Sequence, residues 1–131
     1  MGLEQITGPN IIENAGPWLP YTPVITAGSG TFTSVSATGR YQQIGKTVIV
    51  ALQVAIATNG SAATTVTATL PVSASSSNSA VLTGRETLNN GKQLQGFIVN
   101  TPTLVSIVNY DNSYPGGNGF NLLVSGSYES V

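Results

Sequence analysis

Three carboxylates in the strand-rich part of the sequence could do acid or base chemistry: Glu86, Asp111 and Glu129. A glycoside hydrolase needs two carboxylates at a defined separation, one of them with a raised pKa. Glu86 follows Arg85 on an expected strand, so these two side chains point to opposite faces of the sheet. Asp111 opens a segment of turn composition, where aspartate commonly bonds its own backbone, and Glu129 lies near the C-terminus. We therefore expect solvated or turn carboxylates and no enzymatic activity.

The composition excludes several other chemistries. The 131 residues include no His and no Cys, which rules out Ser-His-Asp and Cys-His nucleophiles, disulfides, and thiolate or imidazole zinc sites. Lys and Arg number four, Asp and Glu five, and the net charge is −1, whereas nucleic-acid binding needs clustered cations. Only 7% of the residues are charged, against roughly a quarter in an average soluble domain. These counts favour a neutral binding or structural domain.

No motif predicts a metal ion or a cofactor. Calcium loops collect several oxygen ligands at fixed spacings, but Asp111-Asn112-Ser113 offers one acid and no bidentate glutamate at the required distance. The stretch Gly116-Gly117-Asn118-Gly119 lacks the lysine and the following helix of a phosphate loop. We expect the protein to work without either.

The segment from Asp111 to Gly119 is the candidate binding site. Aromatic faces stack on the apolar faces of sugars, and amides and carboxylates form hydrogen bonds with hydroxyl groups. The glycines of this segment would let a ligand approach the backbone closely. The residues predicted to contact a ligand are Tyr110, Asp111, Asn112, Tyr114 and Asn118. The alternative is an ordinary long connection between strands, in which Tyr114-Pro115 caps the core.

Short runs of Val, Ile, Thr and aromatic residues, bounded by Gly, Asn and Ser, are typical of strands from Tyr21 onward. The expected strands are Thr31–Ala37, Arg40–Ile44, Thr47–Thr58, Thr64–Leu70, Ala80–Thr87, Lys92–Val99, Leu104–Tyr110 and Phe120–Tyr128. We predict an all-β, antiparallel, jelly-roll-like β-sandwich of about eight strands. Residues 1–20 are expected to form an N-terminal lead-in or linker, and residues 21–131 a single domain.

Three short segments containing glycine are expected to form the tight turns between strands: Thr38-Gly39, Asn59-Gly60 and Asn89-Asn90-Gly91. Within Thr47–Thr58, alternate residues from Val48 to Ile56 are large and apolar and predict a core face. The opposite face is small but hardly polar, so we expect it to be covered as well. Trp18 is expected to close the bottom of the core.

Four segments then carry a resemblance to a known family. They are Trp18-Leu19-Pro20-Tyr21-Thr22-Pro23, Gly30-Thr31-Phe32-Thr33, the run ATGRYQQIGKTV from Ala37 to Val48, and Ser125-Gly126-Ser127-Tyr128. In this order the sequence resembles the C-terminal β-sandwich knob or head domains of bacteriophage tail-fibre, tailspike and related receptor-binding proteins. The resemblance covers Trp18 to the C-terminus. It implies a homotrimer packed around a fibre axis, located at the tail-fibre tip of a virion and acting outside the cell.

These observations predict a trimeric adhesion knob that recognises a glycan or a protein receptor on the host surface. Two alternatives stay open: a purely structural trimerisation or capping domain of a fibre, and a monomeric carbohydrate-binding module. We expect no nucleic-acid partner and no membrane insertion. The longest apolar stretch, Thr47–Ala57, contains Gln53 and is too short to span a bilayer.

Overall fold

The computed structural model describes residues 16–76, 80–98 and 101–131, which contain strands and no helix. The prediction of an all-β, antiparallel fold is confirmed. The described residues form nine strands, one more than expected, because two short strands precede the first long one and two of the expected strands form a single strand, β3. The strands are β1 (Leu19–Tyr21), β2 (Ile25–Ser29), β3 (Ser34–Ile44), β4 (Thr47–Thr58), β5 (Ala63–Thr69), β6 (Ala80–Glu86), β7 (Gln93–Ile98), β8 (Leu104–Asn109) and β9 (Phe120–Glu129).

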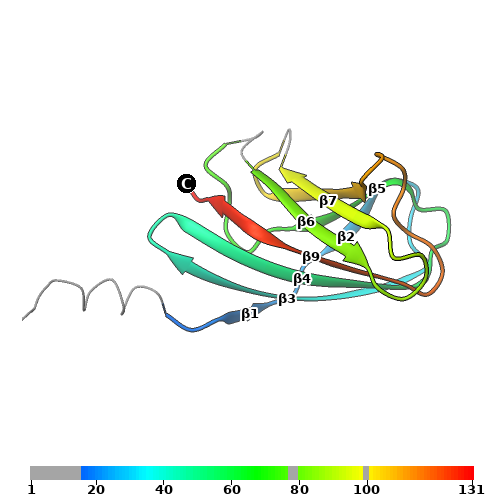
Figure 1. Ribbon diagram of the computed structural model, residues 1–131, viewed down its shortest axis with the longest axis horizontal. Coiled ribbons are helices and arrows are strands. Elements are labelled where there is room, and N and C mark those ends of the chain that lie inside the picture. Colours follow the sequence, from blue (N-terminus) through cyan, green and yellow to red (C-terminus); the bar gives the residue numbers. More distant parts are fainter. Residues whose placement is uncertain (1–15, 77–79, 99–100) are drawn as a thin grey trace, which may run out of the picture.

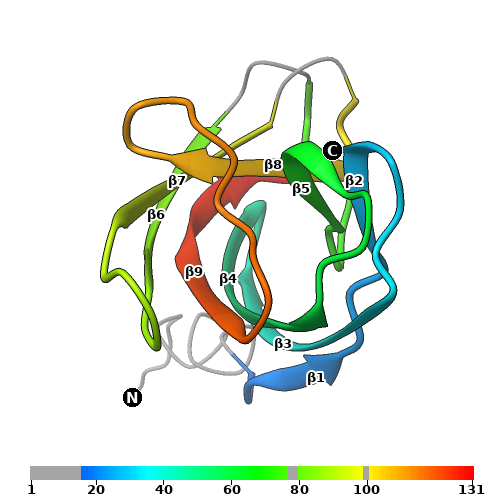
Figure 2. The ribbon, with the colours of Figure 1, turned by 90° about the vertical axis from the view of Figure 1, so that its right-hand side faces the viewer.

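All nine strands belong to one antiparallel sheet, in the order β1-β3-β4-β9-β6-β7-β8-β5-β2 (Figure 1). Figure 2 shows that this sheet curls so far that the two halves of its inner face lie opposite each other. A single curled sheet therefore takes the place of the two separate sheets that a sandwich would have. β1 pairs with β3, so the sheet begins at the end of the expected lead-in; residues 1–15 lie outside the described part of the chain.

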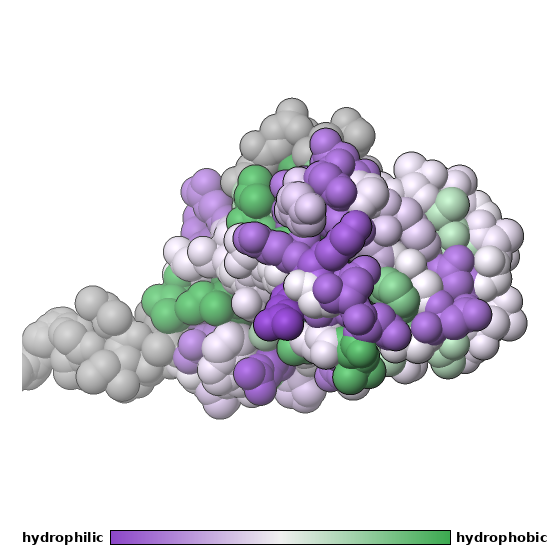
Figure 3. All heavy atoms as spheres, turned by 45° about the vertical axis from the view of Figure 1, so that its right-hand side comes forward, coloured by the Kyte–Doolittle hydropathy of each residue, from purple (hydrophilic) through white to green (hydrophobic). Residues whose placement is uncertain are grey.

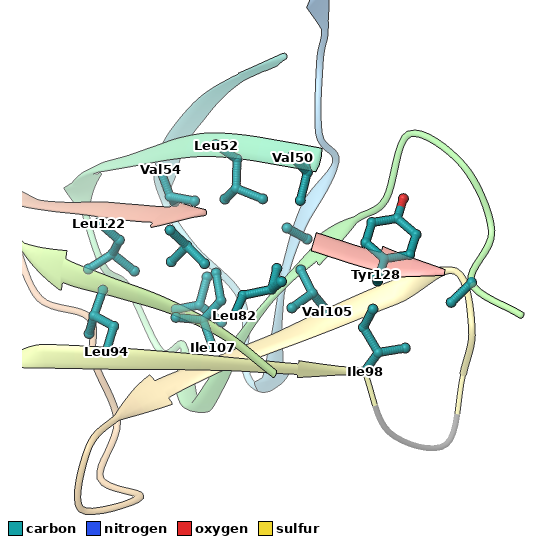
Figure 4. Close-up of a cluster of buried hydrophobic side chains, with 14 of the residues drawn as sticks. Val50, Leu52, Val54, Leu82, Leu94, Ile98, Val105, Ile107, Leu122 and Tyr128 are labelled. Carbon is teal, nitrogen blue, oxygen red and sulfur yellow. The ribbon is translucent and has the colours of Figure 1, made fainter. Parts of the chain in front are cut away.

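The core lies inside the curl. Along β4 the side chains alternate as predicted, with Val48, Val50, Leu52, Val54 and Ile56 all buried. Figure 4 shows side chains of β4 pointing toward those of β6, β7, β8 and β9 across the interior. Burial of these branched apolar side chains stabilises the fold by about 1.5–3 kcal/mol each.

One charged side chain is also buried. Glu86, at the end of β6, has no exposed surface. Its carboxylate accepts hydrogen bonds from the backbone N–H groups of residues 88–91, at 2.7–3.3 Å, and from that of Asn121, at 3.1 Å. Exclusion from water alone would raise the pKa of this carboxyl, but the backbone donors lower it to about 2. The expectation of a turn carboxylate is thus met, but Glu86 is not solvated.

The predicted turn at Thr38-Gly39 is wrong, because β3 runs straight through it from Ser34 to Ile44. Gly39 is required there for a different reason. A Cβ atom at Gly39 would lie 2.4 Å from a ring carbon of Tyr21, so the missing side chain makes room for the Tyr21 ring.

The turn at Asn59-Gly60 exists, with Gly60 in the left-handed region at φ +67°, but it does not form the expected hairpin. β4 pairs with β3 and β9, whereas β5 pairs with β8 and β2. The chain therefore crosses from one side of the curled sheet to the other at this point. The hairpin around Asn89-Asn90-Gly91 is confirmed, since β6 pairs with β7 from Ala80–Ile98 to Arg85–Gln93.

Candidate ligand-binding surface

The predicted binding segment follows β8 and divides into two parts. Its first part is an exposed turn around Asp111, whose carboxylate accepts the backbone N–H of Ser113 at 3.1 Å and the Ser113 hydroxyl. The Ser113 hydroxyl and N–H lower the pKa of Asp111. Asn112 adopts a left-handed backbone, at φ +68°, and its side-chain oxygen accepts a hydrogen bond from Gln95. The Tyr110 side chain is exposed.

The second part of the segment is bound to the turn after β4. The Tyr114 hydroxyl donates to Oδ1 of Asn59 at 2.5 Å, and the backbone N–H of Asn59 donates to Oδ1 of Asn118 at 2.7 Å. Tyr114 packs against the core, which raises the pKa of its hydroxyl, and Pro115 is buried. Tyr114 and Asn118 thus connect the segment to the turn after β4, and Tyr114-Pro115 lies against the core, as the alternative interpretation expected. Ligand contact by Tyr110, Asp111, Asn112, Tyr114 and Asn118 stays a prediction.

A second surface, which the sequence did not single out, lies on the outer face of the sheet. The pairing register aligns one outward row across four strands. Arg40 on β3 pairs with Ala51 on β4, and Ala51 pairs with Ser125 on β9. Ser125 in turn pairs with Thr83 on β6. Because paired residues share a face, these four side chains lie side by side on the outside.

The adjacent outward row contributes the other half of this surface. Gln53 on β4 pairs with Leu123 on β9, which pairs with Arg85 on β6. Arg85 pairs with Gln93 on β7. Together the two rows place one arginine at each side of a strip of small, apolar and hydroxylated residues.

These rows line a groove of about 630 Å³, which we call the outer groove. Arg40, Arg85, Thr83, Leu123 and Ser125 are among its lining residues, and Ala51 lies on its floor. A smaller hollow of about 250 Å³ shares Arg40, Ala51 and Leu123 with it and extends toward Gln53. The side of the molecule turned forward in Figure 3 has hydrophilic side chains gathered at its centre, with separate hydrophobic patches beside them.

Both arginines are held in place by packing. The Arg40 guanidinium lies over the Trp18 ring, with its carbon 5.2 Å from the ring centroid, a cation–π geometry. Trp18 is 44% exposed and does not join the core cluster, so the expectation that it closes the core is wrong. Arg85 lies over the turn at Gly91, where a Cβ atom would come 3.0 Å from Nη2 of Arg85.

One sequence feature could have pointed to the outer groove. Each arginine stands in the tripeptide Thr-Gly-Arg, at residues 38–40 and 83–85. In both tripeptides the glycine faces inward, where another group occupies the space of its missing side chain. At Gly39 that group is a tyrosine ring, and at Gly84 it is the Leu123 carbonyl oxygen, 2.0 Å from an ideal Cβ position. The following arginine therefore faces outward at both sites.

Comparisons of this chain with protein-family models, with curated proteins and with solved structures found no match. The chemistry of the site is therefore argued from its own residues. In the part of the chain that the structure describes, no three acidic side chains gather as a metal site requires. The same residues include no helix long and apolar enough to cross a membrane.

Proposed function

We propose that this protein is a non-catalytic, receptor-binding domain of a phage tail fibre, which attaches the virion to a glycan or protein on the host surface. The observation that carries this proposal is the outer groove, where two arginines, two hydroxyls and side-chain amides surround a small apolar floor. The resemblance of the segments at Trp18, Ala37–Val48 and Ser125 to tail-fibre knob domains supports the same assignment.

The scaffold suits recognition because the groove residues stand on paired strands. Their backbone positions are fixed by hydrogen bonds to neighbours on both sides, in β4, β9 and β6. A site on rigid strands loses little conformational entropy when a ligand binds. The exposed turn at Tyr110, Asp111 and Asn112 supplies a second contact region in this proposal.

We further propose that the domain acts as a homotrimer, so that three weak contacts bind together with high avidity. Exposed apolar side chains near β1 support association. Trp18 and Leu19 are 44% and 45% exposed, and Ile44, on β3 three residues after the partner of Leu19, is 37% exposed. Exposed apolar surface is a common feature of interaction sites. Sedimentation of a stable monomer at micromolar concentration would contradict this part of the proposal.

The same exposed apolar side chains favour a second candidate function, a trimerisation or capping domain that binds no receptor. The two functions differ in what the groove variants do. Adhesion predicts that the labelled full chain binds susceptible bacterial cells and that Arg85→Gln removes this binding. Lys46→Gln, with the same charge change at the exposed turn between β3 and β4, should leave it intact. A chain that forms trimers but adheres to no strain in a broad panel would favour the assembly function.

A further inference from the structure

The outer groove carries positive charge that its own lining does not neutralise. No carboxylate lines the groove in the described part of the chain. Glu86, the neighbour of Arg85 in sequence, is turned into the interior and bonded to backbone N–H groups. Asp111 is bonded to Ser113 in its own turn, and Glu129 lies toward the C-terminal end of β9. The groove therefore attracts anions.

Its two guanidinium groups are available and oriented. Arg40 rests on the Trp18 ring and Arg85 on the Gly91 turn, so apolar and backbone contacts, rather than acids, hold them. A guanidinium presents N–H donors in a planar fork that matches the oxygens of a carboxylate or a phosphate. A guanidinium that already has this orientation in the free protein loses less conformational entropy when a ligand binds.

The space between the arginines is lined by both apolar and hydroxyl groups, and a sugar ring carries both kinds of group. Ala51 and Leu123 offer an apolar floor, and Leu123 is 42% exposed although it lies mid-strand. Thr83 and Ser125 place hydroxyls beside that floor. Sugars present the same combination, with apolar C–H faces and hydroxyl edges, so a charged sugar complements all the groups of the groove.

We propose that the outer groove binds an anionic saccharide. Oxyanions of the saccharide, carboxylates or phosphates, pair with Arg85 at one side of the strip and with Arg40 at the other. Its hydroxyls form hydrogen bonds with Thr83 and Ser125, and an apolar face of its ring rests on Leu123. This inference rests on the proposed receptor-binding function and gives the receptor a chemical class.

The test measures binding of the full chain to three matched ligands by isothermal titration calorimetry. The ligands are a uronic-acid oligosaccharide, the same oligosaccharide with its carboxyls reduced to neutral alcohols, and a phosphorylated oligosaccharide. We expect the anionic ligands to bind, the neutral one to bind about tenfold more weakly or not at all, and the binding to weaken at higher salt. The first and third ligands separate a carboxylate from a phosphate preference.

Variants then locate the site. Arg85→Gln should weaken binding about tenfold or more, and Arg85→Lys less, since it keeps the charge but loses the planar fork. Lys46→Gln is the matched control and should leave the affinity unchanged. Arg40→Gln should resemble Arg85→Gln; because it also loses the contact with Trp18, its thermal unfolding is measured in parallel, and Arg85→Gln alone decides the outcome if Arg40→Gln unfolds.

Equal affinity for the neutral and anionic ligands would overturn the inference. So would an equal loss of saccharide affinity in Arg85→Gln and Lys46→Gln. So would a failure of the chain to bind any of the three ligands. If Arg85→Gln removes adhesion to cells but the chain binds the neutral and anionic saccharides equally, the inference fails and the proposed function stands. If the chain binds neither cells nor saccharides, both the inference and the proposed function fail.

Discussion

The buried carboxylate of Glu86 on β6 accepts a hydrogen bond from the backbone N–H of Asn121 on β9, at 3.1 Å. The same carboxylate binds the turn at residues 88–91. We expect Glu86→Gln to lower the free energy of unfolding by about 2–4 kcal/mol, because an amide nitrogen cannot accept the buried N–H groups. Urea unfolding measures this loss. Glu129→Gln, an exposed carboxylate on the neighbouring strand, should change stability by less than about 0.5 kcal/mol; equal effects would contradict the assignment.

The pH dependence of stability should report the same carboxylate. Its pKa is about 2 in the folded protein, against 4.5 for an unperturbed glutamate. A lowered folded-state pKa stabilises the protein fully above the unfolded value, and this stabilisation is lost as the pH falls from about 4.5 toward 2. The difference corresponds to about 3 kcal/mol. Unfolding measured across this range should show the loss in the wild-type chain, and a much shallower slope in Glu86→Gln.

Tyr21 and Tyr128 should respond in opposite ways to loss of the hydroxyl. The Tyr21 hydroxyl is buried with no hydrogen-bond partner in the described residues, whereas that of Tyr128 donates to the Val72 carbonyl at 2.6 Å. Burial raises the pKa of both hydroxyls, that of Tyr128 to about 12. Tyr21→Phe removes an unsatisfied polar group and should leave stability unchanged or raise it by up to about 1 kcal/mol. Tyr128→Phe should cost about 1 kcal/mol. Thermal unfolding that shows Tyr21→Phe to be less stable than Tyr128→Phe would refute this account.

The Tyr114 hydroxyl should matter for stability more than that of Tyr110. Tyr114→Phe loses the hydrogen bond to Asn59, which should cost about 1 kcal/mol and loosen the connection between β8 and β9. Hydrogen exchange at the Asn59 N–H, which bonds to Asn118, should become faster. Tyr110→Phe alters an exposed side chain and serves as the control; a comparable change in both variants would argue against the anchoring role.

Gly84→Ala should disrupt the junction of β6 and β9. An added Cβ would lie 2.0 Å from the Leu123 carbonyl oxygen, a backbone atom that cannot move without separating the strands. We expect a loss of about 3 kcal/mol or more, or failure to fold. Thr83→Ala, an exposed change on the adjacent residue, should be tolerated. Normal stability of Gly84→Ala in urea unfolding would mean that the strands are farther apart than described.

Local patterns predicted the strands and their faces well, but not the partners of those strands. The alternation from Val48 to Ile56 identifies the buried face of β4 because side chains alternate within any strand. The Asn59-Gly60 pair predicts a turn correctly and a hairpin wrongly, because both edges of β4 are occupied by β3 and β9. That competition is decided by residues more than sixty positions away, which local turn chemistry does not contain.

The candidate sites show the same division. The turn role of Asp111 follows from its own neighbours and could be predicted. Arg40 and Arg85 are forty-five positions apart in the sequence and face one groove only because β4 and β9 lie between their strands. The burial of Glu86 could not be predicted for a related reason. One of the N–H groups that donate to its carboxylate belongs to Asn121, which the register of β9 places beside it.

The position of β9 in the sheet also bears on how the chain folds. This strand, the last of the nine described strands in sequence, is the only pairing link among them between the group β1, β3 and β4 and the group β6, β7, β8, β5 and β2. A chain emerging from the ribosome can form each group separately, but it cannot join them until Phe120–Glu129 has been synthesised. Until then the edges of β4 and β6 stay unpaired and open to association with other chains. Slow closure and a need for protection during synthesis are the expected consequences of this strand order.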